Sequence, residues 1–61
     1  MTTGDRIRTL LELVADDGSV IPAGSVGNVV GFEGERVVIV FEDMDTDTRR
    51  TTVCEVWEVR P

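Results

Sequence analysis

The sequence contains no histidine, lysine, tyrosine or glutamine, and its only cysteine is Cys54. Without histidine, the Cys–His and Ser–His pairs that activate a nucleophile cannot form. One cysteine and no histidine cannot supply the four nitrogen and sulfur ligands of a structural zinc site. We therefore expect Cys54 to be a buried thiol, and we predict a protein that is not an enzyme and holds no cofactor or metal.

Long apolar runs and excess positive charge are also missing. No run approaches the roughly 20 residues of a membrane span, and residues 1–5 do not resemble a signal peptide, so we predict a cytoplasmic protein. Twelve acidic side chains against six arginines give a net charge of −6. This balance argues against nucleic acid, whose phosphates are bound through cations, and favours basic proteins as partners.

The length of 61 residues predicts one domain over 1–61, with 1–3 as a flexible tail. A chain this short buries only about 60% of the surface that its unfolded form exposes, so its core is thin. Small domains often gain stability by association, and a homodimer is therefore an alternative.

Glycines punctuate the segment 21–31, which contains Pro22, Gly24, Gly27 and Gly31. Glycine allows a tight turn and a close approach of two strands, so we predict a turn that leads into a sharply bent strand over 25–32. A bulge near Gly27 would let Val26 and Val29 both face inward.

The clearest strand covers 36–42, where β-branched residues dominate. Alternation places Val38 and Val40 on the face opposite the core, where a partner could cover them. Further strands are expected at 49–53 and 57–59, with a 3₁₀-like turn at 54–56 between them. Alternation also puts Trp57 in phase with Val59, which predicts packing in the core, with a binding interface as the alternative.

Residues 5–14 fit two periods. Ile7, Leu10, Leu11 and Val14 have helical spacing, whereas Ile7, Thr9, Leu11 and Leu13 have strand spacing. No capping box supports a helix, and we expect a strand. A long loop should follow from Ala15 to Gly24, with Val20 and Ile21 turned inward.

These segments together resemble a known family. Gly4–Arg8, Pro22–Val30, Val37–Phe41 and Glu55–Val59 have the layout of small bacterial SH3-like barrels of uncharacterised role. Within them, Gly24-x-x-Gly27-x-Val29 is similar to the KOW motif of ribosomal and transcription proteins. The resemblance implies an all-β, five-stranded SH3-like barrel, and the KOW likeness would imply contact with RNA or the ribosome. These glycines and valines specify a fold and leave the role open.

Two charged clusters are candidate sites. Asp43, Asp45 and Asp47 have the spacing that begins a calcium loop, but the glycine and glutamate that should follow are absent, which favours a solvated acidic loop available to a partner. The arginines should mostly pair with nearby carboxylates. The sharper hypothesis gathers four of them on one sheet face to hold an anion: Arg6, Arg8, Arg49 and Arg50.

The sequence thus predicts a non-catalytic protein–protein interaction or accessory module. Its candidate partner-binding residues are Trp57, Val38, Val40, Asp43, Asp45 and Asp47. One alternative is a KOW-like domain that binds nucleic acid through clustered arginines. Another is a small oligomeric enzyme with a site built across subunits, which no single residue supports.

Overall fold

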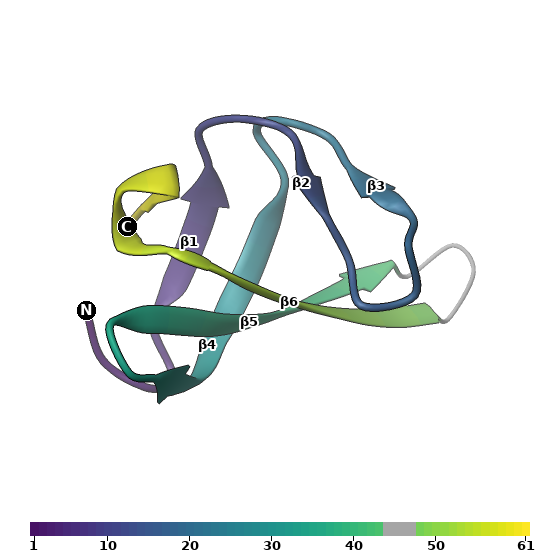
Figure 1. Ribbon diagram of the computed structural model, residues 1–61. Coiled ribbons are helices and arrows are strands. Elements are labelled where there is room, and N and C mark those ends of the chain that lie inside the picture. The colour runs from purple at the N-terminus through teal and green to yellow at the C-terminus, as the bar shows by residue number, and fades with distance from the viewer. Residues whose placement is uncertain (44–47) are drawn as a thin grey trace.

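The computed structural model describes the backbone of residues 1–43 and 48–61 and the side chains of residues 1–42 and 49–61. The described chain is all-β (Figure 1). Its strands are β1 (Arg6–Thr9), β2 (Leu13–Val14), β3 (Val20–Ile21), β4 (Val26–Glu33), β5 (Arg36–Asp43), β6 (Thr48–Glu55) and β7 (Val59–Arg60). Among the described residues the only helix is the 3₁₀ turn η1 (Val56–Glu58), and no helix there is long and apolar enough to cross a membrane.

Five strands form one antiparallel sheet in the order β6-β5-β4-β1-β7, and β2 pairs with β3 in a separate two-stranded sheet. The edge strands β6 and β7 are not paired with each other, so the predicted closed barrel is not formed. The prediction of an all-β fold with a five-stranded sheet is confirmed.

Residues 5–14 are extended in part, and the helical alternative is wrong: they contain two short strands in different sheets, β1 and β2, rather than the single expected strand. Ile7 and Thr9 are buried while Arg6 and Arg8 are exposed, which is the period of two of a half-buried strand. Leu10, which only the helical pattern counted as inward, is 49% exposed, and Leu11, which both patterns counted as inward, is 38% exposed. They lie between β1 and β2, where the chain leaves the sheet.

The core lies between the inner face of the five-stranded sheet and the β2–β3 pair. Its buried apolar residues are Ile7, Leu13, Ala15, Ile21, Val29, Val37, Ile39, Phe41, Cys54 and Val59. Thr52 Oγ1 donates a hydrogen bond to the Val14 carbonyl oxygen at 2.7 Å, and the Asp16 amide donates to the Thr51 carbonyl oxygen at 2.8 Å. These bonds attach β2 and its turn to β6.

Gly27 provides the predicted close approach. It is buried, and a Cβ added there would lie 2.8 Å from Ile39 Cγ2 and 2.9 Å from two ring carbons of Phe41. Nothing lies within 4 Å of a Cβ added at Gly31, so the prediction that Gly31 also allows a close approach of two strands is wrong. Gly24 serves a turn instead, since its φ is +86°.

The bulge lies later in β4 than predicted. Register shifts between Val29 and Gly31, so Val30 is the extra residue. Because Val26–Val29 therefore alternates regularly, Val29 is buried and Val26 is 43% exposed rather than inward. In β3 the same alternation buries Ile21 and leaves Val20 49% exposed, so the inward placement of Val20 is also wrong.

Trp57 does not pack in the core: it is 68% exposed. The predicted 3₁₀ turn exists but covers Val56–Glu58, so Trp57 sits inside the turn and not on a strand in phase with Val59. A capping box fixes this turn, because the Glu58 carboxylate accepts a hydrogen bond from the Glu55 amide at 2.8 Å.

Candidate protein-binding face and cationic corner

The five-stranded sheet presents one face away from the core, which we call the outer face. Burial alternation and strand register assign its residues. They are Arg6, Arg8, Val26, Asn28, Val30, Arg36, Val38, Val40, Glu42, Arg49, Thr51, Val53, Glu55 and Arg60.

Valines occupy the middle of the outer face. Val38 pairs with Gly31 on one side and Val53 on the other, and Val40 pairs with Asn28. Val30 is 49% and Val53 38% exposed, while Val38 and Val40 are half-buried. The expectation that β5 has apolar residues on both faces is therefore confirmed, and Val30 and Val53 extend the apolar surface beyond the two residues that sequence identified.

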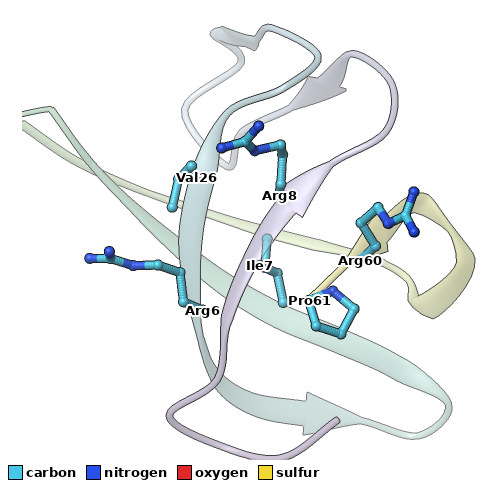
Figure 2. Close-up of a pocket in the computed structure, with 6 residues that line it drawn as sticks. All are labelled: Arg6, Ile7, Arg8, Val26, Arg60 and Pro61. Atoms are coloured by element: carbon cyan, nitrogen blue, oxygen red, sulfur yellow. The ribbon is translucent and has the colours of Figure 1, made fainter.

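Arginines occupy the β1–β7 corner of the outer face. Arg6, Arg8 and Arg60 line a hollow of about 460 Å³, together with Ile7, Val26 and Pro61. Figure 2 shows Arg6 and Arg8 extending to the side of β1 on which Val26 lies, with Arg60 and Pro61 on its other side. We call Arg6, Arg8 and Arg60 the cationic corner.

The other three arginines each have a partner. Arg36 pairs with Glu55 at 3.2 Å and Arg49 with Glu42 at 3.0 Å. Arg50 donates to Ser19 Oγ at 3.2 Å and to the Val20 carbonyl oxygen at 3.1 Å. In the described part of the chain, no residue of the cationic corner has an ion pair.

The four arginines grouped from sequence are thus divided. Arg6 and Arg8 lie together, Arg49 on β6 shares their face but is held by Glu42 on β5, and Arg50 turns toward the β2–β3 turn. Arg60 joins the first two, a neighbour that sequence reasoning missed. Arg60 alternates with the inward-facing Val59 in the expected closing strand, so the sequence could have placed Arg60 on the outer face. It did not indicate that this strand pairs with β1.

A smaller hollow of about 380 Å³ adjoins the cationic corner and is lined by Arg6, Val26, Asn28 and Glu42. Glu42 is engaged by Arg49 and does not reach ion-pair distance of Arg6. A carboxylate therefore marks where the cationic corner ends and the rest of the outer face begins.

Reactive groups are few in the described chain. Cys54 is only 5% exposed. Its burial, aided by the charges of Glu58 and Glu55, raises the pKa of the thiol to about 11, so the thiol is protonated at neutral pH. Hydrogen bonds from the hydroxyl and amide of Ser19 lower the pKa of Asp17 in an exposed turn. No group of three metal-ligating side chains occurs among the described residues, and most of the Asp43-x-Asp45-x-Asp47 run lies outside them.

No protein-family model, curated protein or solved structure matches this chain.

Proposed function

We propose that this protein is a non-catalytic protein-binding module that contacts its partner through the valines of the outer face. The supporting observation is the apolar surface formed by Val38 and Val53, which pair across β5 and β6, together with the exposed bulge residue Val30, which precedes Gly31, the β4 partner of Val38. In the described chain the β2–β3 pair covers the opposite, core side of this sheet. Contiguous apolar surface on a small protein is typical of an interaction site.

Trp57 supports the same function from η1. It is 68% exposed on η1, which the Glu55–Glu58 capping box makes rigid. Tryptophan is enriched among the residues that dominate binding energy, and a fixed turn lowers the entropy lost when it is covered.

The SH3-like interpretation belongs to this proposal. Its supports are the antiparallel order of the five-stranded sheet, the irregular first connection that carries β2 and β3, and the 3₁₀ turn before the last strand. The peptide groove of signalling SH3 domains is lined with aromatics, whereas this chain has only Phe32, Phe41 and Trp57, and Phe41 is buried. A different binding face, the valine surface, therefore fits this chain better.

The test compares three immobilised baits in extracts of the source cell: the wild type, Val30→Asp and Val14→Asp. Val14 is a matched control because it is 63% exposed on the separate β2–β3 sheet. We expect a partner that the wild type and Val14→Asp retain and that Val30→Asp loses, and the purified partner should reproduce this pattern. Equal retention by all three baits, or no reproducible partner, would contradict the proposal.

Self-association is tested separately by light scattering. A mass of twice 6.7 kDa for the wild type that returns to the monomer in Val30→Asp would identify a second copy as the partner. A monomer in both cases excludes the homodimer and leaves a different protein as the partner.

A further inference from the structure

The cationic corner contains a direct pairing of like charges. Arg8 and Arg60 are opposite each other in the β1–β7 ladder, which places their Cβ atoms roughly 5 Å apart. Arg6 follows two residues away on the same face, roughly 7 Å along the strand. Like charges directly opposite in a ladder are destabilising, so this arrangement opposes folding.

Neutralising carboxylates are plentiful in the chain but absent from the hollow. Twelve acidic side chains accompany six arginines, and two of the other three arginines have an acidic partner. The residues that line the larger hollow include three arginines and no acidic side chain. Three arginines therefore line a hollow that has no acidic side chain of its own, although the protein as a whole is acidic. A negatively charged group from a partner would neutralise them.

The hollow also offers an apolar surface between these charges. Val26 and Pro61 line it, and Ile7 lies beneath with 1% of its surface exposed. An apolar side chain could lie on Val26 and Pro61 while carboxylates on either side of it meet the guanidinium groups, whose planar N–H donors match carboxylate geometry.

A nucleic acid fits the same corner poorly. Phosphate-backbone binding uses several contacts along a cationic track, often about six to ten. Here the track ends at Glu42 after three arginines, and no aromatic side chain lines the hollow on which a base could stack.

We propose that the hollow at the cationic corner binds a short acidic segment of a partner protein, with an apolar side chain flanked by carboxylates. This inference rests on the proposed protein-binding function and gives the chemistry of the partner. It also replaces the basic partner that net charge alone suggested with an acidic one at this location.

The test uses fluorescence anisotropy with a labelled peptide that alternates Glu and Leu, at low ionic strength. We expect Arg8→Gln and Arg60→Gln each to weaken binding by about three- to fivefold, the range of an exposed ion pair, and the double variant by about tenfold. Arg36→Gln makes the same change in net charge at a distant, paired arginine, and its affinity should stay within about twofold of the wild type. A peptide with Gln in place of Glu should not bind, and one with Ser in place of Leu should bind more weakly.

Several outcomes would overturn the inference. Absence of peptide binding would do so, and so would equal weakening by Arg36→Gln, which would show an effect of net charge alone. Binding of oligothymidylate more tightly than the peptide would identify a phosphate site instead. If Arg8→Gln failed to fold, circular dichroism would show it, and Arg60→Gln together with Arg8→Lys would decide the question.

The two proposals can fail independently. A partner lost by Val30→Asp but indifferent to Arg8→Gln and Arg60→Gln would sustain the valine surface and refute the acidic segment. Peptide binding at the cationic corner with no partner dependent on Val30 would refute the valine surface as the main contact.

Discussion

Replacing Gly27 with alanine should destabilise the protein through one identifiable clash. The new Cβ would lie 2.8 Å from Ile39 Cγ2 and 2.9 Å from Phe41 Cδ1 and Cε1, whereas carbon atoms prefer about 3.5–4.0 Å. Overpacking of this kind costs about 1–3 kcal/mol, and alanine recovers about 0.5–1 kcal/mol because it is less flexible than glycine in the unfolded chain. Three contacts under 3.0 Å place the cost in the upper part of this range, about 2–3 kcal/mol, so the net loss should be about 1–2.5 kcal/mol, from a total stability of roughly 3–9 kcal/mol for a chain of this length.

Urea and thermal denaturation followed by far-ultraviolet circular dichroism measure this loss, and the midpoint temperature should fall by about 5–15 °C. Gly31→Ala is the matched control, since it also lies in β4, nothing is within 4 Å of its Cβ and its φ is not positive. Without a clash it should leave stability unchanged or raise it by up to about 1 kcal/mol, the gain expected from replacing glycine with alanine at a compatible position. The argument is refuted if Gly27→Ala is as stable as the wild type, or if both variants lose the same amount. Phe41→Leu should lower the free energy of unfolding less in the Gly27→Ala background than in the wild type, because removing the ring also removes its clash with the new methyl group.

Three further predictions concern single side chains. The raised pKa of Cys54, about 11 against an ordinary 9.0, means that the unfolded chain releases the thiol proton first as pH rises, so stability should fall between pH 9 and pH 11 by up to about 2–3 kcal/mol. The chain has no lysine or tyrosine to mask this slope, and Cys54→Ala should flatten it in pH-dependent urea titrations. Trp57→Ala should cost less than about 1 kcal/mol in thermal melts because the side chain is 68% exposed, whereas a loss of about 3–5 kcal/mol would show that it is buried. Thr52→Val should cost about 1–3 kcal/mol by leaving the Val14 carbonyl without its 2.7 Å hydrogen bond, and Thr51→Val, at a half-buried neighbour, is the control in the same melts.

Sequence patterns identified the strands that are half-buried and keep a period of two, and missed β3, which was expected to lie in a loop. Residues 36–42 and Arg6–Thr9 show this alternation without interruption. Gly27 was recognisable as a close approach because glycine weakens a strand unless space requires it. Burial of Cys54 followed from the lack of any residue that could activate it, and the structure confirms that it is buried.

Errors arose wherever one residue shifts the phase of the alternation. The bulge at Val30 rather than Gly27 reversed the expected direction of Val26. The 3₁₀ turn begins two residues later than expected and carries Trp57 out of the strand. Both features depend on which backbone hydrogen bonds are made, and the identities of neighbouring residues do not determine these bonds.

The candidate site was only half visible in the sequence for a related reason. Arg6 and Arg8 share a face because they are two residues apart on one strand, which any strand assignment predicts. Arg60 joins them through the pairing of Arg8 with Arg60, a contact across more than fifty residues that depends on the register of the last strand. Long-range register is set by the packing of the whole core, and local pattern carries little information about it.

A net charge of −6 and a site for an acidic segment are compatible because the two effects act over different distances. At physiological ionic strength, charges farther apart than about 8 Å are largely screened from each other. Carboxylates elsewhere on the surface therefore slow the approach of an acidic partner, while contacts at Arg8 and Arg60 hold it once it arrives. Added salt should accelerate association by screening the repulsion and also accelerate dissociation by weakening the arginine pairs. Rates of association and dissociation that both rise with salt are thus the kinetic signature of a local cationic site on an acidic protein, and stopped-flow measurements on the Glu-Leu peptide can separate the two rates.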